Sequence, residues 1–262
     1  MKKINSFIII GLVAVTSLSG QIELLNRRFE FTPGIRYDRS ISSPKDYLGY
    51  ELGTEYTLYS DVLSYLRTLG KESDRVSIHP YGKTHEGRDL EYLVITGGKN
   101  RNRLDDIQKN NQRLADPRSI NPAVAKKIIR ENPGIYWLSY NVHGNEASST
   151  EAVMQVAYRL AAGQDKETKT ILDNSVVILV PCINPDGRDR YVYWYKSAQS
   201  YVTNTDQFDY EHDEPWPGGR TNHYWFDLNR DWVWMVHPES KGLIAAYQEW
   251  LPKIHVDYHE MG

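Results

Sequence analysis

Residues 176–183 form an almost uninterrupted apolar run, which constrains the fold more than any other stretch. A strand that is apolar at consecutive positions is normally covered on both faces, as in a sheet with helices on each side. Other strand-like segments alternate with helix-like ones: 75–79, 90–96, 134–141 and 254–259 against 56–69, 102–115, 123–130, 148–162 and 238–250. This alternation predicts an α/β fold with a mixed, mainly parallel central sheet and helices on both faces. A long loop is predicted from Asn184 to about Asn222.

The chain is predicted to have three parts. Residues 1–20 have the pattern of a signal peptide, with two lysines, a short apolar stretch and a small-residue cleavage site. That stretch is too short to span a bilayer, so export to the periplasm or the extracellular space is expected. Residues 21–55, rich in Pro, Gly, Tyr and charge, are predicted to be an extended N-terminal leader. Residues 56–262 are predicted to form the folded domain.

Charge and cysteine content exclude several classes of protein. The formal net charge is −3 and there is no block of basic residues, so neither a nucleic-acid partner nor stable membrane association is expected. The single Cys182 cannot form an intramolecular disulfide. It is predicted to be a buried strand residue, and a nucleophilic thiol is the weaker alternative. The oligomeric state is left open.

Two histidines and a glutamate are placed where predicted strands end. His143 and Glu146 follow the strand at 134–141, and His259 ends the strand at 254–259. Ligand sites in such sheets form outside the carboxyl ends of strands. Two imidazoles and one carboxylate are a common donor set for a catalytic zinc with one open position. The alternative for His143-x-x-Glu146 alone is a polar loop with a helix-capping glutamate.

Strand alternation puts His255, Asp257 and His259 on one face. Asp257 is therefore either a hydrogen-bond acceptor behind a ligand histidine or a solvated loop residue. His255 is predicted to be structural. The remaining histidines lack ligand spacing and are predicted to be surface or packing residues: His79, His85, His212, His223 and His237.

The Asn229-Arg230 pair offers a fork suited to a carboxylate. A metal beside a carboxylate anchor suggests a peptidase that works from the C-terminal end of its substrate. Arg220, on its own, would be interpreted as a surface loop residue. The aromatic residues of the two loop regions either line a substrate cleft or pack internally: Tyr191, Tyr193, Trp194, Tyr195, Trp225, Trp232 and Trp234.

An ordered series of motifs resembles the zinc carboxypeptidases of the metallocarboxypeptidase family, the peptidases similar to carboxypeptidases A and B. The series runs His143-x-x-Glu146, Asn184-Pro185-Asp186-Gly187, Gly219-Arg220, Asp227-Leu228-Asn229-Arg230 and His259, and residues 82–88 look like that family's first hairpin. The resemblance covers roughly residues 56–262. It implies a carboxypeptidase-like fold, of which these residues are about the N-terminal two thirds of the catalytic domain, with the C-terminal part missing.

The resemblance implies a role for each matched residue. His143, Glu146 and His259 would hold one Zn²⁺ ion, and Asp227 would support His143 from behind. Arg220 would polarise the scissile carbonyl and stabilise the oxyanion. Asn229 and Arg230 would bind the free carboxylate of the substrate. The partners implied are peptide or protein C-termini.

The family's general base is a glutamate on a later strand, which the resemblance implies beyond Gly262. Glu260 is a poor substitute, because alternation points it away from the face of His259. We therefore expect a fragment of a longer protein that binds zinc weakly and hydrolyses peptides negligibly. The alternative is a natural short form that binds metal without hydrolysis.

The function predicted is that of an exported zinc metallocarboxypeptidase. A related zinc amidase or deacylase acting on cell-wall peptides or acylated amino acids is one alternative. A non-catalytic module that captures peptide C-termini through Asn229 and Arg230 is another. The preferred C-terminal residue and the physiological substrate do not follow from the sequence.

Overall fold

The computed structural model describes residues 31–116, 118, 120–202 and 204–260. The chain divides into two compact units, residues 1–35 and 36–262. Of the first unit, residues 31–35 are described and contain a turn in which the Ile35 N–H donates to the Thr32 carbonyl. The predicted signal peptide, residues 1–20, lies outside the described residues. All elements below belong to the second unit.

One five-stranded sheet with the order β1-β2-β4-β3-β5 forms the centre of this unit. Its strands are β1 (Val76–Lys83), β2 (Asp89–Ile95), β3 (Gly134–Tyr140), β4 (Ser175–Val180) and β5 (Ile254–Tyr258). β2 runs antiparallel to β1 and to β4, whereas β3 runs parallel to both β4 and β5. Four of the five strands therefore share one direction. The predicted mixed, mainly parallel sheet is confirmed.

The apolar run seen in the sequence supplies the middle strand, β4, and all six of its residues are buried. Side chains of a strand alternate between the two faces of the sheet. Ile178 accordingly packs with Trp137 in one core cluster, and Leu179 packs with Tyr140 in another. Each face of the sheet thus carries its own hydrophobic core.

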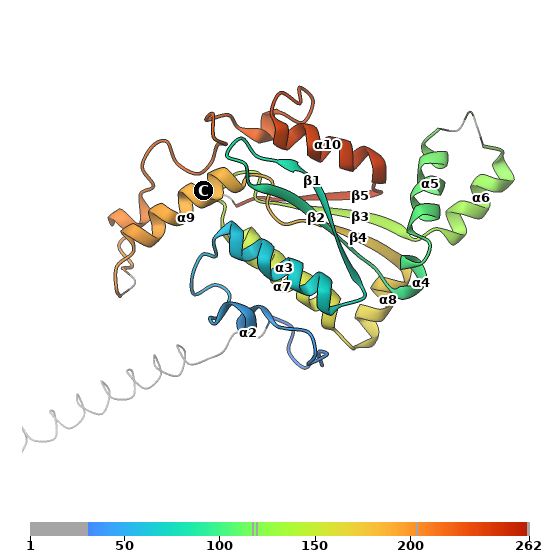
Figure 1. Ribbon diagram of the computed structural model, residues 1–262, viewed down its shortest axis with the longest axis horizontal. Helices are drawn as coiled ribbons and strands as arrows, with labels where there is room; N and C mark the ends of the chain where they lie inside the picture. Colours follow the sequence, from blue (N-terminus) through green and yellow to red (C-terminus); the bar gives the residue numbers. More distant parts are fainter. Residues whose placement is uncertain (1–30, 117, 119, 203, 261–262) are drawn as a thin grey trace, which may run out of the picture. The chain divides into compact units, whose positions relative to one another are not determined.

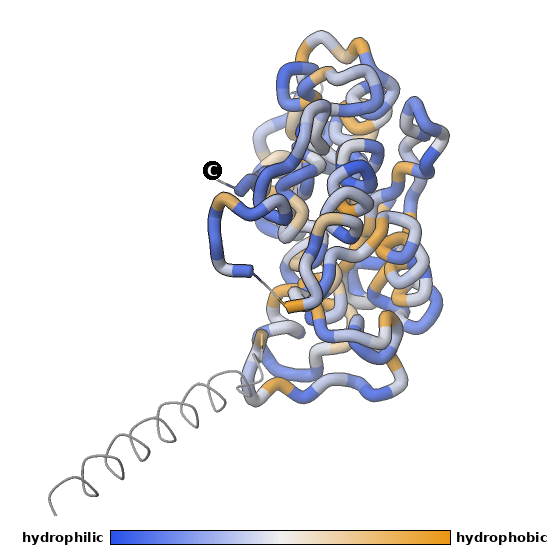
Figure 2. Tube along the Cα trace, turned by 90° about the vertical axis from the view of Figure 1, so that its left-hand side faces the viewer, coloured by the Kyte–Doolittle hydropathy of each residue, from blue (hydrophilic) through white to orange (hydrophobic). Residues whose placement is uncertain are grey.

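Helices cover both faces of the sheet (Figure 1). The helices are α2 (Pro44–Leu48), α3 (Tyr59–Glu72), α4 (Gly98–Arg101), α5 (Leu104–Ala115), α6 (Pro122–Glu131), α7 (Ser148–Ala162), α8 (Lys166–Asn174), α9 (Pro185–Ala198) and α10 (Pro238–Trp250), with 3₁₀ turns η2 (Tyr210–His212) and η3 (Leu228–Arg230). α10 packs on the face of Trp137, whereas α3 and α7 pack on the face of Tyr140. Hydrophobic positions recur between hydrophilic ones along these elements (Figure 2).

The predicted loop from Asn184 to about Asn222 is wrong over its first part, because residues 185–198 form α9. Asn184 caps this helix by accepting a hydrogen bond from the Gly187 N–H at 3.0 Å. Pro185 occupies the first turn, where a missing N–H costs nothing. The sequence Asn-Pro-Asp-Gly therefore starts a helix and not the predicted loop, and the aromatic side chains of this helix hide its periodicity.

Residues 36–55, which belong to the predicted leader, contain the short helix α2 and an isolated bridge between Tyr37 and Gly163. The Tyr37 ring stacks on the ring of Tyr158 in α7 with centroids 4.7 Å apart.

None of the described helices has the length and apolar character needed to cross a bilayer.

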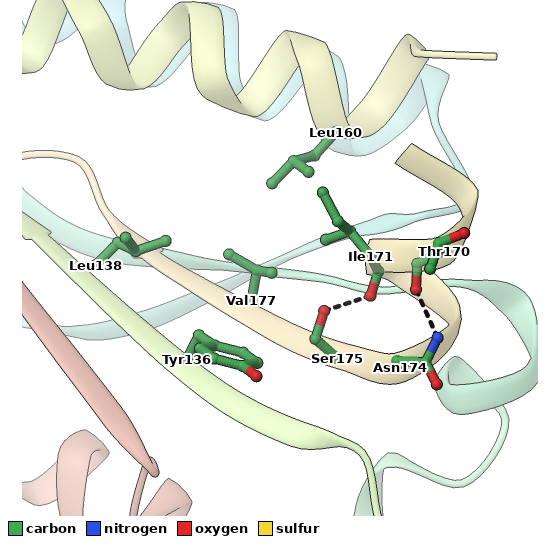
Figure 3. A pocket seen from close by; sticks show the side chains of 8 residues that line it. All are labelled: Tyr136, Leu138, Leu160, Thr170, Ile171, Asn174, Ser175 and Val177. Carbon is green, nitrogen blue, oxygen red and sulfur yellow. Dashed lines mark hydrogen bonds between the residues drawn. The ribbon is translucent and has the colours of Figure 1, made fainter. Parts of the chain in front are cut away.

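One face of the sheet is open beside α7 and α8, where a pocket of about 600 Å³ is found. In Figure 3, Leu160 and Ile171 of the two helices approach Tyr136, Leu138 and Val177 of the strands. The same face of β5 is also partly exposed, with Ile254 51% and Tyr258 38% accessible. This region is apolar and shares no residue with the polar clusters described below.

Candidate metal centre

His143, Glu146 and His259 come together at the carboxyl ends of β3 and β5. One ligand atom from each lies within 4.8 Å of the other two. His143 Nδ1 is 2.7 Å from Glu146 Oε1, and His259 Nδ1 is 3.0 Å from Glu146 Oε2. Because β3 and β5 are adjacent and parallel, both histidines reach the same edge of the sheet.

The turn that carries His143 and Glu146 is organised by Asn141, which has a left-handed backbone with φ 58°. Its buried side-chain Nδ2 donates to the carbonyls of His143 and Glu146, both at 2.8 Å. Asparagine is one of the few residues other than glycine that adopts this conformation readily. Asn141 therefore fixes the direction in which both ligand side chains leave the strand.

Gly144 lies where three chain segments cross. A Cβ atom at this position would lie 2.2 Å from the Arg188 nitrogen and 2.5 Å from the Gly219 carbonyl oxygen, both too close for any side chain. This crossing holds the His143 turn against the start of α9 and against the loop that carries Arg220. The roles of Asn141 and Gly144 were not predicted from the sequence, although a glycine inside the candidate motif was a usable signal.

Each ligand histidine has an aspartate on its far ring nitrogen. Asp227 Oδ1 lies 3.1 Å from His143 Nε2, and Asp257 Oδ2 lies 2.9 Å from His259 Nε2. An aspartate there accepts the Nε2 proton and leaves the Nδ1 lone pair of each ring free for a metal. Of the two interpretations left open for Asp257, the structure favours the acceptor behind a histidine.

The two aspartates have opposite pKa shifts. Burial raises the pKa of Asp227, but His143, the Asn229 N–H and Arg220 together outweigh burial and hold it below its usual value. Burial dominates at Asp257 and keeps its pKa above the usual value despite the neighbouring His259. Asp227 is thus the more strongly ionised of the two carboxyl groups.

Arg220 reaches the cluster from the loop before η3. Its Nη2 donates to Asp227 Oδ2 at 3.1 Å, and its Nη1 lies 3.8 Å from Glu146 Oε1. The side chain remains 48% accessible, so its guanidinium faces both the cluster and the solvent. Arg220 is thus an exposed loop residue, as its type alone suggested, and it also contacts Asp227 of the cluster.

Asn229 and Arg230 are the last two residues of η3, whose N-cap is Asp227. Arg230 is exposed and its Nη1 donates to the Asn229 carbonyl at 3.1 Å. The Asn229 side-chain oxygen accepts a hydrogen bond from Trp232 Nε1 at 3.1 Å. The structure thus brings Asp227 and Arg220 to the cluster, while Arg230 is exposed and, among the described residues, forms no hydrogen bond or ion pair with the three cluster residues.

Glu260 and Cys182 are not free for chemistry at this cluster. Glu260 Oε1 accepts the backbone N–H of Ser148 at the start of α7 at 2.8 Å. Cys182 is buried, as predicted, but it lies beyond the end of β4 and not in a strand, and its Sγ donates to Asn141 Oδ1 at 3.1 Å. Burial raises the pKa of the Cys182 thiol to about 12, which disfavours a nucleophilic thiolate.

The donor set fits a zinc ion. Two imidazole nitrogens and a carboxylate oxygen, with the outer nitrogens held by aspartates, are what catalytic zinc sites use. Among the described residues, the basic side chains within 4.0 Å of the Glu146 carboxylate are His143, His259 and Arg220, the last at 3.8 Å. A mixed α/β sheet with this donor set at its carboxyl edge is typical of a metal-dependent hydrolase.

The family model of the zinc carboxypeptidases matches residues 62–248, and the chain belongs to this family. Among curated proteins it is similar to carboxypeptidase 2 of Trichophyton equinum, with 23% identity over 214 residues, and to carboxypeptidase 2 of Trichophyton tonsurans, also with 23% identity. These matches cover 81% of this chain but 30% of each relative. The chain thus spans less than a third of the length of these relatives.

A solved structure supports the fold. The chain is similar to a metallo-carboxypeptidase from Burkholderia cenocepacia with a TM-score of 0.50 and 17% sequence identity. The match covers 79% of this chain and 42% of that chain. At this level of identity the likeness concerns the fold alone.

Proposed function

We propose that the protein is a zinc metallocarboxypeptidase that removes residues from the C-terminal ends of peptides. The observation that carries the proposal is the meeting of His143, Glu146 and His259 within 4.8 Å. An aspartate behind each histidine and an arginine beside the glutamate support it. The chain belongs to the zinc carboxypeptidase family, whose model matches residues 62–248 and so includes His143 and Glu146.

In this proposal His143, Glu146 and His259 hold one Zn²⁺ ion. Zinc, when bound, supplies a Lewis acid and makes water acidic enough to be a nucleophile near neutral pH. Asp227 and Asp257 keep the Nε2 protons of the two histidines and so keep each Nδ1 unprotonated.

Arg220 is proposed to stabilise the negative charge that develops on the scissile carbonyl oxygen. Its guanidinium is anchored by Asp227 at 3.1 Å, yet 48% of its side chain is accessible to an incoming peptide. A donor fixed before the substrate arrives contributes most in the transition state, by roughly 3–4 kcal/mol.

Asn229 and Arg230 are proposed to bind the terminal carboxylate of the substrate. A guanidinium makes two parallel hydrogen bonds to a carboxylate, which an ammonium group cannot reproduce. Arg230 is exposed, and it follows Asp227, which binds His143, by three residues, so both observations support this role. This contact would orient the last peptide bond toward the metal centre.

We expect the 262-residue polypeptide by itself to hydrolyse peptides negligibly. General-base catalysis needs a carboxylate within hydrogen-bond reach of the attacking water. Among the described residues, Asp227 and Asp257 hold the histidines and Glu260 binds the Ser148 N–H. Efficient turnover by the purified 262-residue polypeptide would contradict this expectation.

Export and domain organisation are also proposals. Residues 1–20 are proposed to be a signal peptide that is removed, residues 21–55 a leader, and residues 56–262 part of the catalytic domain. N-terminal sequencing of the mature protein should find a start close to residue 20. A mature chain that begins at Met1 would contradict export by this route.

The function is tested with a pair of peptides that differ only at the C-terminus, one with a free acid and one with an amide. The full-length enzyme should release the last residue of the free acid alone, because Arg230 requires a carboxylate. Equal cleavage of both peptides would favour the amidase or deacylase alternative. Binding of the free acid without turnover by zinc-loaded protein would favour a non-catalytic module.

A further inference from the structure

A second cluster of metal-binding side chains consists of His85, His237 and Glu239, none of which belongs to the centre described above. One ligand atom from each lies within 4.8 Å of the other two. His85 comes from the turn between β1 and β2. His237 is the N-cap of α10, and Glu239 lies in the first turn of that helix. Side chains from two segments about 150 residues apart in the sequence therefore meet at one point.

The carboxylate of Glu239 is buried, with 1% of the residue accessible. Its Oε1 accepts the His85 N–H at 3.3 Å, whereas its Oε2 has no hydrogen-bond partner among the described residues. That unpartnered oxygen lies 3.9 Å from His85 Nε2 and so faces the cluster. A buried carboxylate without a partner is costly unless a proton or a cation neutralises it.

The ring nitrogens of His85 and His237 point at each other, with His85 Nε2 3.0 Å from His237 Nδ1. The Asn222 side chain determines which of these nitrogens lacks a proton. Its Oδ1 accepts the backbone N–H groups of Tyr224 and Phe226, so its Nδ2 donates toward His237 Nδ1 at 3.0 Å. His237 Nδ1 is thereby kept unprotonated, and a metal bound at this nitrogen would replace the Asn222 Nδ2–H as the partner of its lone pair.

The distances between donors suit a small divalent ion. Donors about 2.0–2.1 Å from a tetrahedral zinc lie about 3.3 Å from one another. The observed separations of 3.0 Å for His85–His237 and 3.9 Å for His85–Glu239 are on either side of that value. The centre at His143 has separations of 2.7 and 3.0 Å, so both clusters need only small side-chain shifts.

We propose that His85, His237 and Glu239 form a second divalent-cation site with a preference for zinc. Two imidazoles and one carboxylate match the ligands that zinc takes in proteins. His85 is 24% accessible and leaves a path from solvent, while His237 and Glu239 are buried. A water molecule would fill the fourth position on the exposed side.

The role proposed for this ion is structural. It would join the β1–β2 turn to the start of α10 and to the preceding segment. Asp231 connects that segment to His237 by accepting the His237 N–H at 2.9 Å, and Asn229 and Arg230 come immediately before Asp231. A bound ion would therefore stiffen the chain around the proposed carboxylate anchor without touching substrate.

The test compares zinc bound per chain, by mass spectrometry of the desalted full-length protein, in the wild type and in single variants. His85→Ala and, independently, Glu239→Gln should each lower the content by one equivalent. His223→Ala is the matched control, because His223 is an exposed neighbour that binds Glu86 and not the cluster. It should retain the wild-type content. Circular dichroism verifies that each variant is folded.

Unchanged zinc in both His85→Ala and Glu239→Gln would overturn the second site. A loss in His223→Ala equal to that in His85→Ala would also overturn it, because the effect would then not be specific to the cluster. His143→Ala separates this inference from the proposed function. If His143→Ala keeps all its zinc while His85→Ala loses one equivalent, the second site stands and the proposed catalytic centre fails.

Thermal unfolding gives a second, independent measure. Zinc should raise the melting temperature of His143→Ala, in which the second cluster is intact, because a ligand that binds only the folded state stabilises it. The same addition should leave the melting temperature of the double variant His143→Ala/His85→Ala unchanged. An equal rise in both variants would contradict the site.

Discussion

The two clusters of this chain offer the same donors, two imidazoles and one glutamate, but their surroundings differ. At His143 and His259 an aspartate holds each outer ring nitrogen, and Arg220 lies beside the glutamate. At His85 and His237 no described carboxylate other than Glu239 comes within 4.0 Å of either ring. One cluster lies at the carboxyl edge of the sheet, and the other joins a turn to a helix start.

This difference indicates which cluster can perform chemistry. Aspartates behind the ligand histidines raise their basicity and fix the ring orientation, which a catalytic ion needs when its other ligands change. An arginine with 48% accessibility can reach a substrate. The second cluster has donors but neither of these features, so its ion would hold structure. The donor set therefore does not by itself distinguish a catalytic site from a structural one.

The largest expected difference between the clusters is in activity. His143→Ala should lower kcat/KM of the full-length enzyme by about 10³-fold or more, since metal catalysis supplies several kcal/mol of transition-state stabilisation. His85→Ala should lower it by less than about 10-fold. The measurement is steady-state hydrolysis of a free-acid peptide. Similar losses in the two variants would remove the distinction drawn between the clusters.

Substitution of the carboxylate anchor should have the next largest effect. Arg230→Lys keeps the charge but loses the two parallel hydrogen bonds, so kcat/KM for a free-acid peptide should fall by about 10- to 100-fold. Zinc content should not change, because Arg230 binds neither cluster in the structure. Unimpaired hydrolysis by this variant would place the anchor elsewhere.

Asp227→Asn tests the support behind the first cluster. The substitution keeps the shape but removes the charge at His143 Nε2, and the zinc affinity of that cluster should fall by about 10- to 100-fold. Competition with a chelator gives the affinity of each ion. The ion assigned to His85 should be unaffected, and a weakening of both ions would contradict their independence.

Asn141 provides a smaller and more local test. Asn141→Gly tolerates the left-handed backbone but loses the side-chain donors to the His143 and Glu146 carbonyls, at a cost of about 1–3 kcal/mol in the free energy of unfolding. Asn141→Ala should cost a further 1–2 kcal/mol, roughly the strain of the left-handed conformation. Denaturant unfolding measures both values. Equal stabilities of the two variants would contradict the importance of the backbone conformation.

The smallest expected effect concerns Cys182, whose buried thiol donates to Asn141 in the turn that carries His143. Because burial raises the pKa of its thiol to about 12, almost no thiolate exists at pH 8. Iodoacetamide at pH 8 should therefore leave Cys182 unlabelled in the native protein and label it after denaturation. Rapid labelling of the native protein would show that the Cys182 thiol is accessible and ionised, contrary to its burial.

Much of the fold was predictable from the sequence because the spacing of hydrophobic residues indicates each helix and strand. The predicted helix at residues 148–162 has the same bounds as α7. The apolar run at 176–183 supplies most of the buried strand β4, which ends at Val180, and its last three residues are buried beyond the strand. The failure at α9 has a physical cause. Its Asn-Pro-Asp-Gly start is also a turn sequence, and aromatic residues occupy several faces of the helix.

The two clusters differ in how far the sequence predicts them. His143 and Glu146 are three residues apart and His259 ends a strand, so strand ends and motif order were enough to suggest that they meet. His85 and His237 were predicted to be surface or packing residues, since nothing in their spacing brings them together. Their approach depends on how α10 packs against β1, which only tertiary structure supplies.

The proposed function depends above all on a zinc ion held by His143, Glu146 and His259. Anomalous X-ray scattering at the zinc absorption edge, from crystals of the full-length protein grown with zinc, tests it most directly. We expect a strong anomalous peak for an ion bonded to His143 Nδ1, His259 Nδ1 and Glu146. Crystals with zinc bound elsewhere and no peak among these three side chains would contradict it.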